Sequence, residues 1–208
     1  MQLLDVTGPL QVFATANDIL TDSGGDAPYV LRIVARGGRN VTASTGVVIG
    51  TTTLPSSDAE VDTLLISGGT VVDDVAGDAV LVAWLRDRAG CARRVGSVCT
   101  GAMLLGAAGV LDGRRAVTHW SFCAELARRY PAIRMESDPI FVRDGPVWTS
   151  AGVTSGIDLA LAMVEEDLGR ATALAVARYL VVFLKRPGGR LSSARRCPPN
   201  SLTTGSMR

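Results

Sequence analysis

The sequence is poor in the residues that build metal sites. It contains a single histidine, His119, and four cysteines, none of which forms a Cys-x-x-Cys pair. Structural zinc sites usually combine such pairs with one another or with histidines. We therefore expect no metal ion and no cofactor in this chain. Any mechanism that needs an imidazole must use His119.

Long apolar runs and an excess of charge of one sign are also absent. A membrane-spanning helix needs about 18 consecutive apolar residues, and no run in the sequence approaches that length. No signal peptide opens the chain, so we expect a cytoplasmic protein with no membrane partner. The formal net charge of +1 is too small for the chain as a whole to bind nucleic acid as a polycation.

The composition fits one sizeable α/β domain, since the chain has 208 residues, of which 47% are hydrophobic. Short β-type runs alternate with helical patterns along it. The expected strands lie at 29–35, 61–67, 94–98 and 116–118, and the expected helices at 78–89, 101–108, 121–130, 156–168 and 171–184. This alternation predicts a doubly wound, mostly parallel sheet with helices on both faces.

Two local signals add detail to this predicted secondary structure. Asp144-Gly145 stands between the β-type runs 140–143 and 147–150 and predicts a hairpin. Ser121 precedes a helical pattern with Glu125 nearby, which predicts that Ser121 is the N-cap of that helix.

The most informative local pattern surrounds Cys99. The apolar run 95–98 reaches Cys99, Gly101 follows two residues later, and an Ala/Leu-rich helical segment comes next. This is the pattern of a nucleophile elbow, in which the reactive residue sits on a sharp turn between a strand and a helix. A helix N-terminus lowers a thiol pKa, so we expect a reactive thiolate. The alternative is a buried structural cysteine, the commoner fate of a lone cysteine, but the glycines and the strand-to-helix switch favour the elbow.

Longer motifs resemble a known family. The segments 3–13, 97–101 and 107–120 are similar to the ThiJ/PfpI superfamily, which is class I glutamine-amidotransferase-like and flavodoxin-like in fold. Two branches share these motifs, the isocyanide hydratases and the AraC-type transcription regulators that carry the domain as an N-terminal sensor. The segments 139–153, 165–169 and 177–189 look more like the regulators.

The resemblance also implies how the chain is organised. Residues 1–190 correspond to the ThiJ/PfpI-like domain, and 191–208 are expected to form a disordered tail, because they are rich in Ser, Pro, Thr and Arg. The family's first strand, which normally comes just before Leu3, and the regulators' helix-turn-helix domain are expected to be missing. The chain would then contact DNA only through that absent domain. A homodimer and a small-molecule ligand are implied as partners.

Two residues are expected to act beside Cys99. The resemblance places the carboxyl of Asp5 beside the Cys99 thiol, although the sequence alone would favour a helix cap for Asp5. Because Thr100 follows the nucleophile, its N–H would point to an oxyanion. The protease-like members have a histidine where this chain has Thr100, and threonine cannot act as a base, so a peptidase is not expected.

Four more residues are candidate ligand-binding residues. Gly68 and Gly69 follow the strand expected at 61–67, where their N–H groups would complete an anion site, although a plain turn is the simpler interpretation. By resemblance His119 and Trp120 lie near the elbow and line the pocket. The alternative is a structural histidine beside its tryptophan.

These observations leave two main candidate functions. The regulator-like motifs favour a small-molecule-sensing domain of an AraC-type regulator without its DNA-binding part. The alternative is a cofactor-free, isocyanide-hydratase-like enzyme, in which a Cys99 thiolate attacks the substrate to form a thioimidate. Asp5 would then activate water and release an N-formamide. A third possibility is a thiol that is merely oxidised. The sequence leaves open whether the chain is an enzyme.

Overall fold

The computed structural model describes residues 1–56, 58–69 and 76–183. A four-stranded sheet lies at its centre, with the strand order β3-β4-β8-β7. The strands are β3 (Thr63–Ile66), β4 (Arg94–Val98), β7 (Phe141–Asp144) and β8 (Val147–Ser150). Strands β3, β4 and β8 run parallel, and β7 is antiparallel to β8. The predicted α/β fold with a mostly parallel sheet is therefore confirmed.

Strand β4 is the central strand of this sheet. All five of its residues are buried, and Val95 pairs with Leu64 on one side and with Val147 on the other. A continuous apolar run is typical of a parallel strand that is covered on both faces. The run that leads to Cys99 therefore ends at the carboxyl edge of the sheet, where loops from several strands converge.

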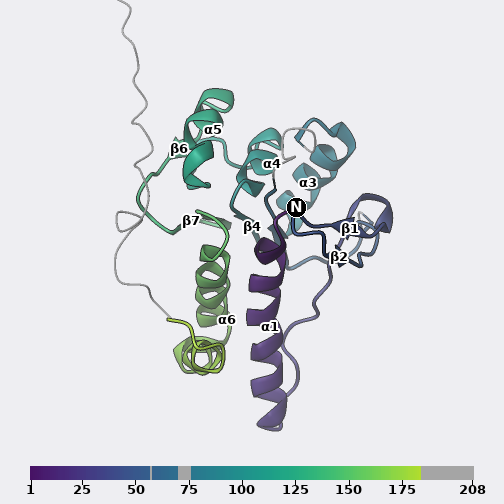
Figure 1. Cartoon of the computed structure of the whole chain (residues 1–208), viewed down its shortest axis with the longest axis vertical. Coiled ribbons are helices and arrows are strands. Elements are labelled where there is room, and N and C mark those ends of the chain that lie inside the picture. Colours follow the sequence, from purple (N-terminus) through teal and green to yellow (C-terminus); the bar gives the residue numbers. More distant parts are fainter. Residues whose placement is uncertain (57, 70–75, 184–208) are drawn as a thin grey trace, which may run out of the picture.

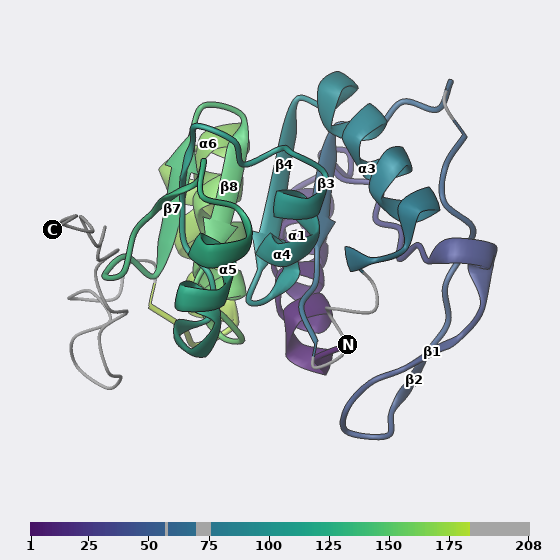
Figure 2. The same ribbon diagram turned by 90° about the horizontal axis from the view of Figure 1, so that it is seen from above.

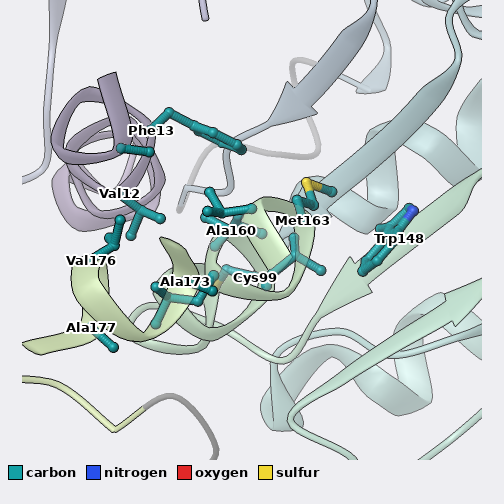
Figure 3. Packing of buried hydrophobic residues seen from close by; sticks show 14 residues of the cluster. Val12, Phe13, Cys99, Trp148, Ala160, Met163, Ala173, Val176 and Ala177 are labelled. Carbon is teal, nitrogen blue, oxygen red and sulfur yellow. The ribbon is translucent and has the colours of Figure 1, made fainter. Parts of the chain in front are cut away.

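Helices cover both faces of the sheet (Figures 1 and 2). The helices are α1 (Leu3–Asp22), α3 (Ala79–Cys91), α4 (Gly101–Ala107), α5 (Cys123–Arg129) and α6 (Ser155–Tyr179). Helices α1 and α6 supply one core, which includes Val12, Phe13 and Met163 (Figure 3). Helices α3, α4 and α5 supply the other core, which includes Leu85 and Leu105. Each face is thus closed by its own apolar cluster.

Smaller elements complete the fold. They are η1 (Arg36–Gly38), β1 (Val41–Thr42), β2 (Val48–Ile49), β5 (Arg115–Ala116), η2 (Trp120–Phe122) and β6 (Arg134–Met135). The predicted hairpin is confirmed, because Asp144 pairs with Val147 across Gly145, whose φ is +61°. Gly169, with φ +82°, interrupts α6 between the two segments that the sequence predicts as separate helices.

Two local predictions are wrong. The run 29–35 forms only an isolated bridge between Val34 and Thr52, because β-type residues become a strand only when a neighbouring strand pairs with them. Ser121 does not cap α5. Its N–H donates instead to Nδ1 of His119 at 3.4 Å, within a short 3-10 turn. The tail predicted to be disordered, 191–208, lies outside the described residues, so the predicted boundary at 190 stays a prediction.

A buried ion pair ties the start of β4 to α6. Arg94 is 2% exposed, and its guanidinium forms two hydrogen bonds with the Asp167 carboxylate. The Tyr29 hydroxyl donates to the same carboxylate at 3.0 Å. Arg94 also donates to Thr63 Oγ1 of β3 at 2.8 Å. These contacts hold β3 and β4 against α6 at the amino end of β4. Cys99 follows the carboxyl end of the same strand.

Candidate active site

Cys99 sits on a sharp turn between β4 and α4. Its N–H donates to the Ser150 carbonyl of β8 at 3.1 Å, and its own carbonyl accepts from the Thr118 hydroxyl at 2.8 Å. Its φ is +59°, a value that costs an L-residue about 1–2 kcal/mol and that is enriched at functional sites. The turn has the geometry of the predicted nucleophile elbow.

Gly101 allows α4 to start directly above β3. A Cβ at this position would lie 2.3 Å from the Ile66 carbonyl oxygen, closer than any real contact. The helix can therefore begin two residues after Cys99 only because residue 101 has no side chain.

Gly101→Ala is expected to lower the free energy of unfolding by about 3 kcal/mol, the upper range for an overpacked site, because backbone must move to admit the methyl group. The matched control is Gly90→Ala in α3, where a Cβ meets nothing within 4 Å. That change should raise stability by about 0.5 kcal/mol, since alanine favours helix. Urea unfolding of both variants checks this. Equal midpoints for Gly101→Ala and the wild type would contradict the tight contact.

The Asp5 carboxyl lies beside the Cys99 thiol. Asp5 is in the first turn of α1 and only 3% exposed. Its Oδ2 accepts from the Gly68 N–H at 3.0 Å, and the carboxyl also interacts with the Cys99 thiol. The residue at the N-cap of α1 is Gln2. The carboxyl thus faces the nucleophile, and the helix-cap interpretation of Asp5 does not hold.

Burial shifts the pKa values of both groups. Desolvation raises the pKa of Asp5 to about 6, although the Gly68 N–H and the thiol stabilise its anion. Desolvation, and then the negative charge of Asp5, raise the pKa of Cys99 to about 11. The expected low thiol pKa is therefore wrong, because burial and a neighbouring carboxylate outweigh the helix N-terminus.

Thr100, Gly68 and Gly69 form the wall beside this pair. The Thr100 hydroxyl accepts from the Gly69 N–H at 2.8 Å and donates to the Gly69 carbonyl at 3.0 Å. A Cβ at Gly68 would lie 2.6 Å from the Thr100 hydroxyl and 2.9 Å from Asp5 Oδ2. Gly68 therefore lets its own loop approach both the Thr100 turn and the first turn of α1. The amides of Gly68 and Gly69 donate to Asp5 and to Thr100. The Thr100 N–H points to the Cys99 sulfur.

The loop after β8 also reaches the sulfur, and the sequence interpretation missed it. The Val153 N–H donates to Cys99 Sγ, and a Cβ at Gly152 would lie 3.4 Å from the same sulfur. One signal was present, since loops at the carboxyl ends of neighbouring parallel strands meet at one site. The small residues after β8 fit that position.

His119 lies beside Gly152, on the same side as Cys99. A Cβ at Gly152 would be 3.0 Å from His119 Cδ2 and 3.4 Å from Cys99 Sγ, so the ring and the sulfur flank the space that the absent side chain leaves. His119 Nδ1 is 2.7 Å from the Ser121 hydroxyl. Trp120 is 45% exposed, with its ring centroid 5.5 Å from that of His119. Trp120 is therefore exposed beside His119, whereas Asp5 and Cys99 are buried.

The described part of the chain offers no metal centre and no membrane-spanning helix. Within residues 1–56, 58–69 and 76–183, no three histidine, cysteine or acidic side chains come together as metal ligands. In the same ranges no helix combines the length and the apolar character that crossing a membrane would require.

Comparison with known proteins identifies the family. Residues 1–166 match the model of the DJ-1/PfpI family. The chain belongs to this family. The family that the sequence motifs suggested, ThiJ/PfpI, is thereby confirmed.

Proteins that are similar to this chain include an isonitrile hydratase and transcriptional regulators. An isonitrile hydratase of Pseudomonas putida is 36% identical over 180 residues, which cover 86% of this chain and 73% of that protein. The transcriptional regulator CdhR of Pseudomonas aeruginosa is 33% identical over 168 residues. This match covers 76% of this chain and 47% of the regulator, so the chain spans about half the length of that relative.

Solved structures of the DJ-1/PfpI type show the same division. A ThiJ/PfpI family protein from Pseudomonas syringae is 30% identical, with a TM-score of 0.77 and coverage of 95% of this chain and 77% of that one. An AraC family transcriptional regulator from Pseudomonas putida is 26% identical, with a TM-score of 0.73 and coverage of 86% and 93%. This chain is thus related both to isonitrile hydratase and to regulator domains.

Proposed function

We propose that the Asp5–Cys99 site hydrates isonitriles, or small electrophiles with a similar terminal carbon, to N-formamides. The observation that carries the proposal is the buried Asp5 carboxyl against a thiol on an elbow. Hydration of R–N≡C to R–NH–CHO needs a nucleophile for the carbon and a group that both gives and takes a proton. Cys99 and Asp5 supply these two roles.

In the first step the thiol adds to the substrate. The Cys99 proton passes to Asp5 while the sulfur forms a bond with the terminal carbon. Asp5 then gives that proton to the same carbon, and the product is the thioimidate R–N=CH–S–Cys99. The whole substrate and the thiol proton are retained in this adduct. The N–H groups of Thr100 and Val153 stabilise the sulfur as its negative charge develops.

In the second step water releases the product. The Asp5 carboxylate takes a proton from water, the water oxygen adds to the thioimidate carbon, and the proton passes to the nitrogen. The carbon–sulfur bond then breaks, the sulfur leaves with the electron pair, and the hydroxyl proton returns to it through Asp5. The pKa of Asp5, raised to about 6 by burial, suits a group that exchanges protons near neutral pH.

Several features favour hydration over peptide hydrolysis. Threonine follows the nucleophile, and its hydroxyl is bonded to Gly69. A Cys–His pair of the peptidase type would need an imidazole there. The relative named isonitrile hydratase matches 86% of this chain. We therefore also propose that the chain is not a peptidase.

A second candidate is a ligand-sensing domain of an AraC-type regulator. The observation that favours it is the similarity to the transcriptional regulator CdhR, which is 33% identical over 168 residues. In this case His119 and Trp120 would contact a small ligand, and a homodimer would suit a regulator of paired half-sites.

The test is direct hydration by the wild-type chain. Isonitriles labelled with carbon-13 at the terminal carbon are incubated with the protein, and the formyl carbon is followed by NMR. The proposal predicts a formamide signal that grows in proportion to protein concentration. Unchanged isonitriles, alkyl and aryl alike, would overturn the enzyme proposal and leave the sensor candidate.

A further inference from the structure

The loop between β8 and α6 is held by a clasp around Gly152. The Ser155 hydroxyl accepts from the Gly152 N–H at 2.8 Å and donates to the Gly152 carbonyl at 2.8 Å. The Ser155 N–H donates to the same carbonyl at 2.8 Å. Ser155 is 5% exposed, so these bonds are shielded from water. One hydroxyl thus holds both polar groups of a single residue.

The clasped residue has a backbone conformation that requires glycine. Gly152 has φ +135°, which residues with a side chain rarely adopt, and it lies beside both Cys99 and His119. The next residue in the chain is Val153, whose N–H donates to Cys99 Sγ. The direction of that N–H is set by the peptide plane that follows Gly152. Any change in the backbone torsions of Gly152 would therefore turn the donor away from the sulfur.

We propose that Ser155 is a positioning residue, whose hydroxyl fixes the Gly152 turn so that the Val153 N–H, together with the Thr100 N–H, cradles the Cys99 thiolate. The cradle is formed by two loops, one after β4 and one after β8. This role deepens the proposed hydration, on which its kinetic consequence rests. The reactivity of the thiol itself is independent of that reaction.

The electrostatic surroundings explain why such a cradle matters. The titratable groups near Cys99 include Asp5 on α1 and His119, which flanks Gly152. Burial and the Asp5 carboxylate both oppose ionisation of the sulfur, whereas the N–H groups of Thr100 and Val153 and the side chain of Thr100 favour it. A hydrogen bond to an ionised group is stronger than one to a neutral group. Loss of the Val153 donor should therefore raise the thiol pKa further.

The experiment measures alkylation of Cys99 by iodoacetamide in the full chain, resolved by peptide mapping, at mildly alkaline pH. Exposed Cys91 provides an internal reference for the reagent. Ser155→Ala should slow the modification of Cys99 about tenfold, which corresponds to a pKa rise of about one unit. The matched pair Ser155→Thr and Ser155→Val differs only by a hydroxyl in place of a methyl group. Ser155→Thr should react as the wild type does, and Ser155→Val should be as slow as Ser155→Ala.

Ser97→Ala is the control for loss of a buried hydroxyl. Ser97 lies on β4, two residues before Cys99, and its hydroxyl has no hydrogen-bond partner among the described residues. Its removal should leave the Cys99 rate unchanged. A folded Ser155→Ala or Ser155→Val variant that alkylates at the wild-type rate overturns the proposal.

Amide NMR of the wild type decides the matter if every Ser155 variant unfolds. The Val153 N–H signal should then shift with ionisation of Cys99 and stay constant in Cys99→Ala. A Val153 N–H signal that does not shift when Cys99 ionises contradicts the cradle. If the wild type hydrates no isonitrile while the alkylation pattern holds, the proposed function fails and the role of Ser155 stands.

Discussion

Cys99→Ala is expected to abolish the hydration of isonitriles, with a fall in kcat of at least about a thousandfold, as other enzymes show when they lose a nucleophile. The fold should survive, because alanine accepts the φ of +59° about as well as cysteine does. Cys99→Ser should be nearly as inactive, since a hydroxyl ionises far less readily than a thiol. Formamide production followed by NMR measures both variants.

The control for this result is the other thiol described as free. Cys91 is exposed at the end of α3, and Cys91→Ala should retain the wild-type rate. Both substitutions remove one sulfur, so a difference between them assigns the chemistry to the elbow. A Cys99→Ala variant with most of its activity would mean that water attacks the substrate without covalent catalysis.

Asp5→Asn is expected to lower kcat by about a hundredfold to ten-thousandfold, the usual contribution of a general acid–base residue. The same change should make the thiol more reactive. The Asp5 carboxylate helps to raise the pKa of Cys99 to about 11, and the neutral amide removes that repulsion. Alkylation of Cys99 should therefore become faster while hydration becomes slower. A merely structural role would slow both or neither.

The stability of the fold should depend on the ionisation of Asp5. Because burial raises the pKa of Asp5 from 3.8 to about 6, the protonated carboxyl stabilises the folded state at low pH. That contribution to stability is lost as the pH rises through about 6. The stability of Asp5→Asn should not show this fall. Asp18→Asn, an exposed change on the same helix, should follow the wild type in both stability and rate. Identical pH profiles of stability for Asp5→Asn and the wild type would contradict the buried carboxyl.

The parts of the structure that local patterns determine could be predicted from the sequence. The run 94–98, Cys99 and the glycine at 101 predict the strand, the turn and the helix in order, since each signal lies next to the others in the chain. Asp144-Gly145 predicts the hairpin for the same reason. The placement of Asp5 against Cys99 needed the family resemblance, because 94 positions separate the two residues in the sequence.

The remaining features depend on contacts that no local pattern contains. The segment 29–35 has strand-forming residues, but only Val34 finds a pairing partner. The thiol pKa rises where the helix N-terminus suggested a fall, because its environment is set by burial and by Asp5. The Val153 donor and its Ser155 clasp come from a loop more than fifty residues after the nucleophile.

The most direct test of the central claim is rapid-quench mass spectrometry of the wild-type chain mixed with an isonitrile. The account predicts an adduct with the mass of the whole isonitrile on the peptide that contains Cys99. This adduct should rise before the formamide and disappear as the substrate is consumed. Formamide that accumulates while the Cys99 peptide stays unmodified would contradict the assignment of Cys99 as the nucleophile.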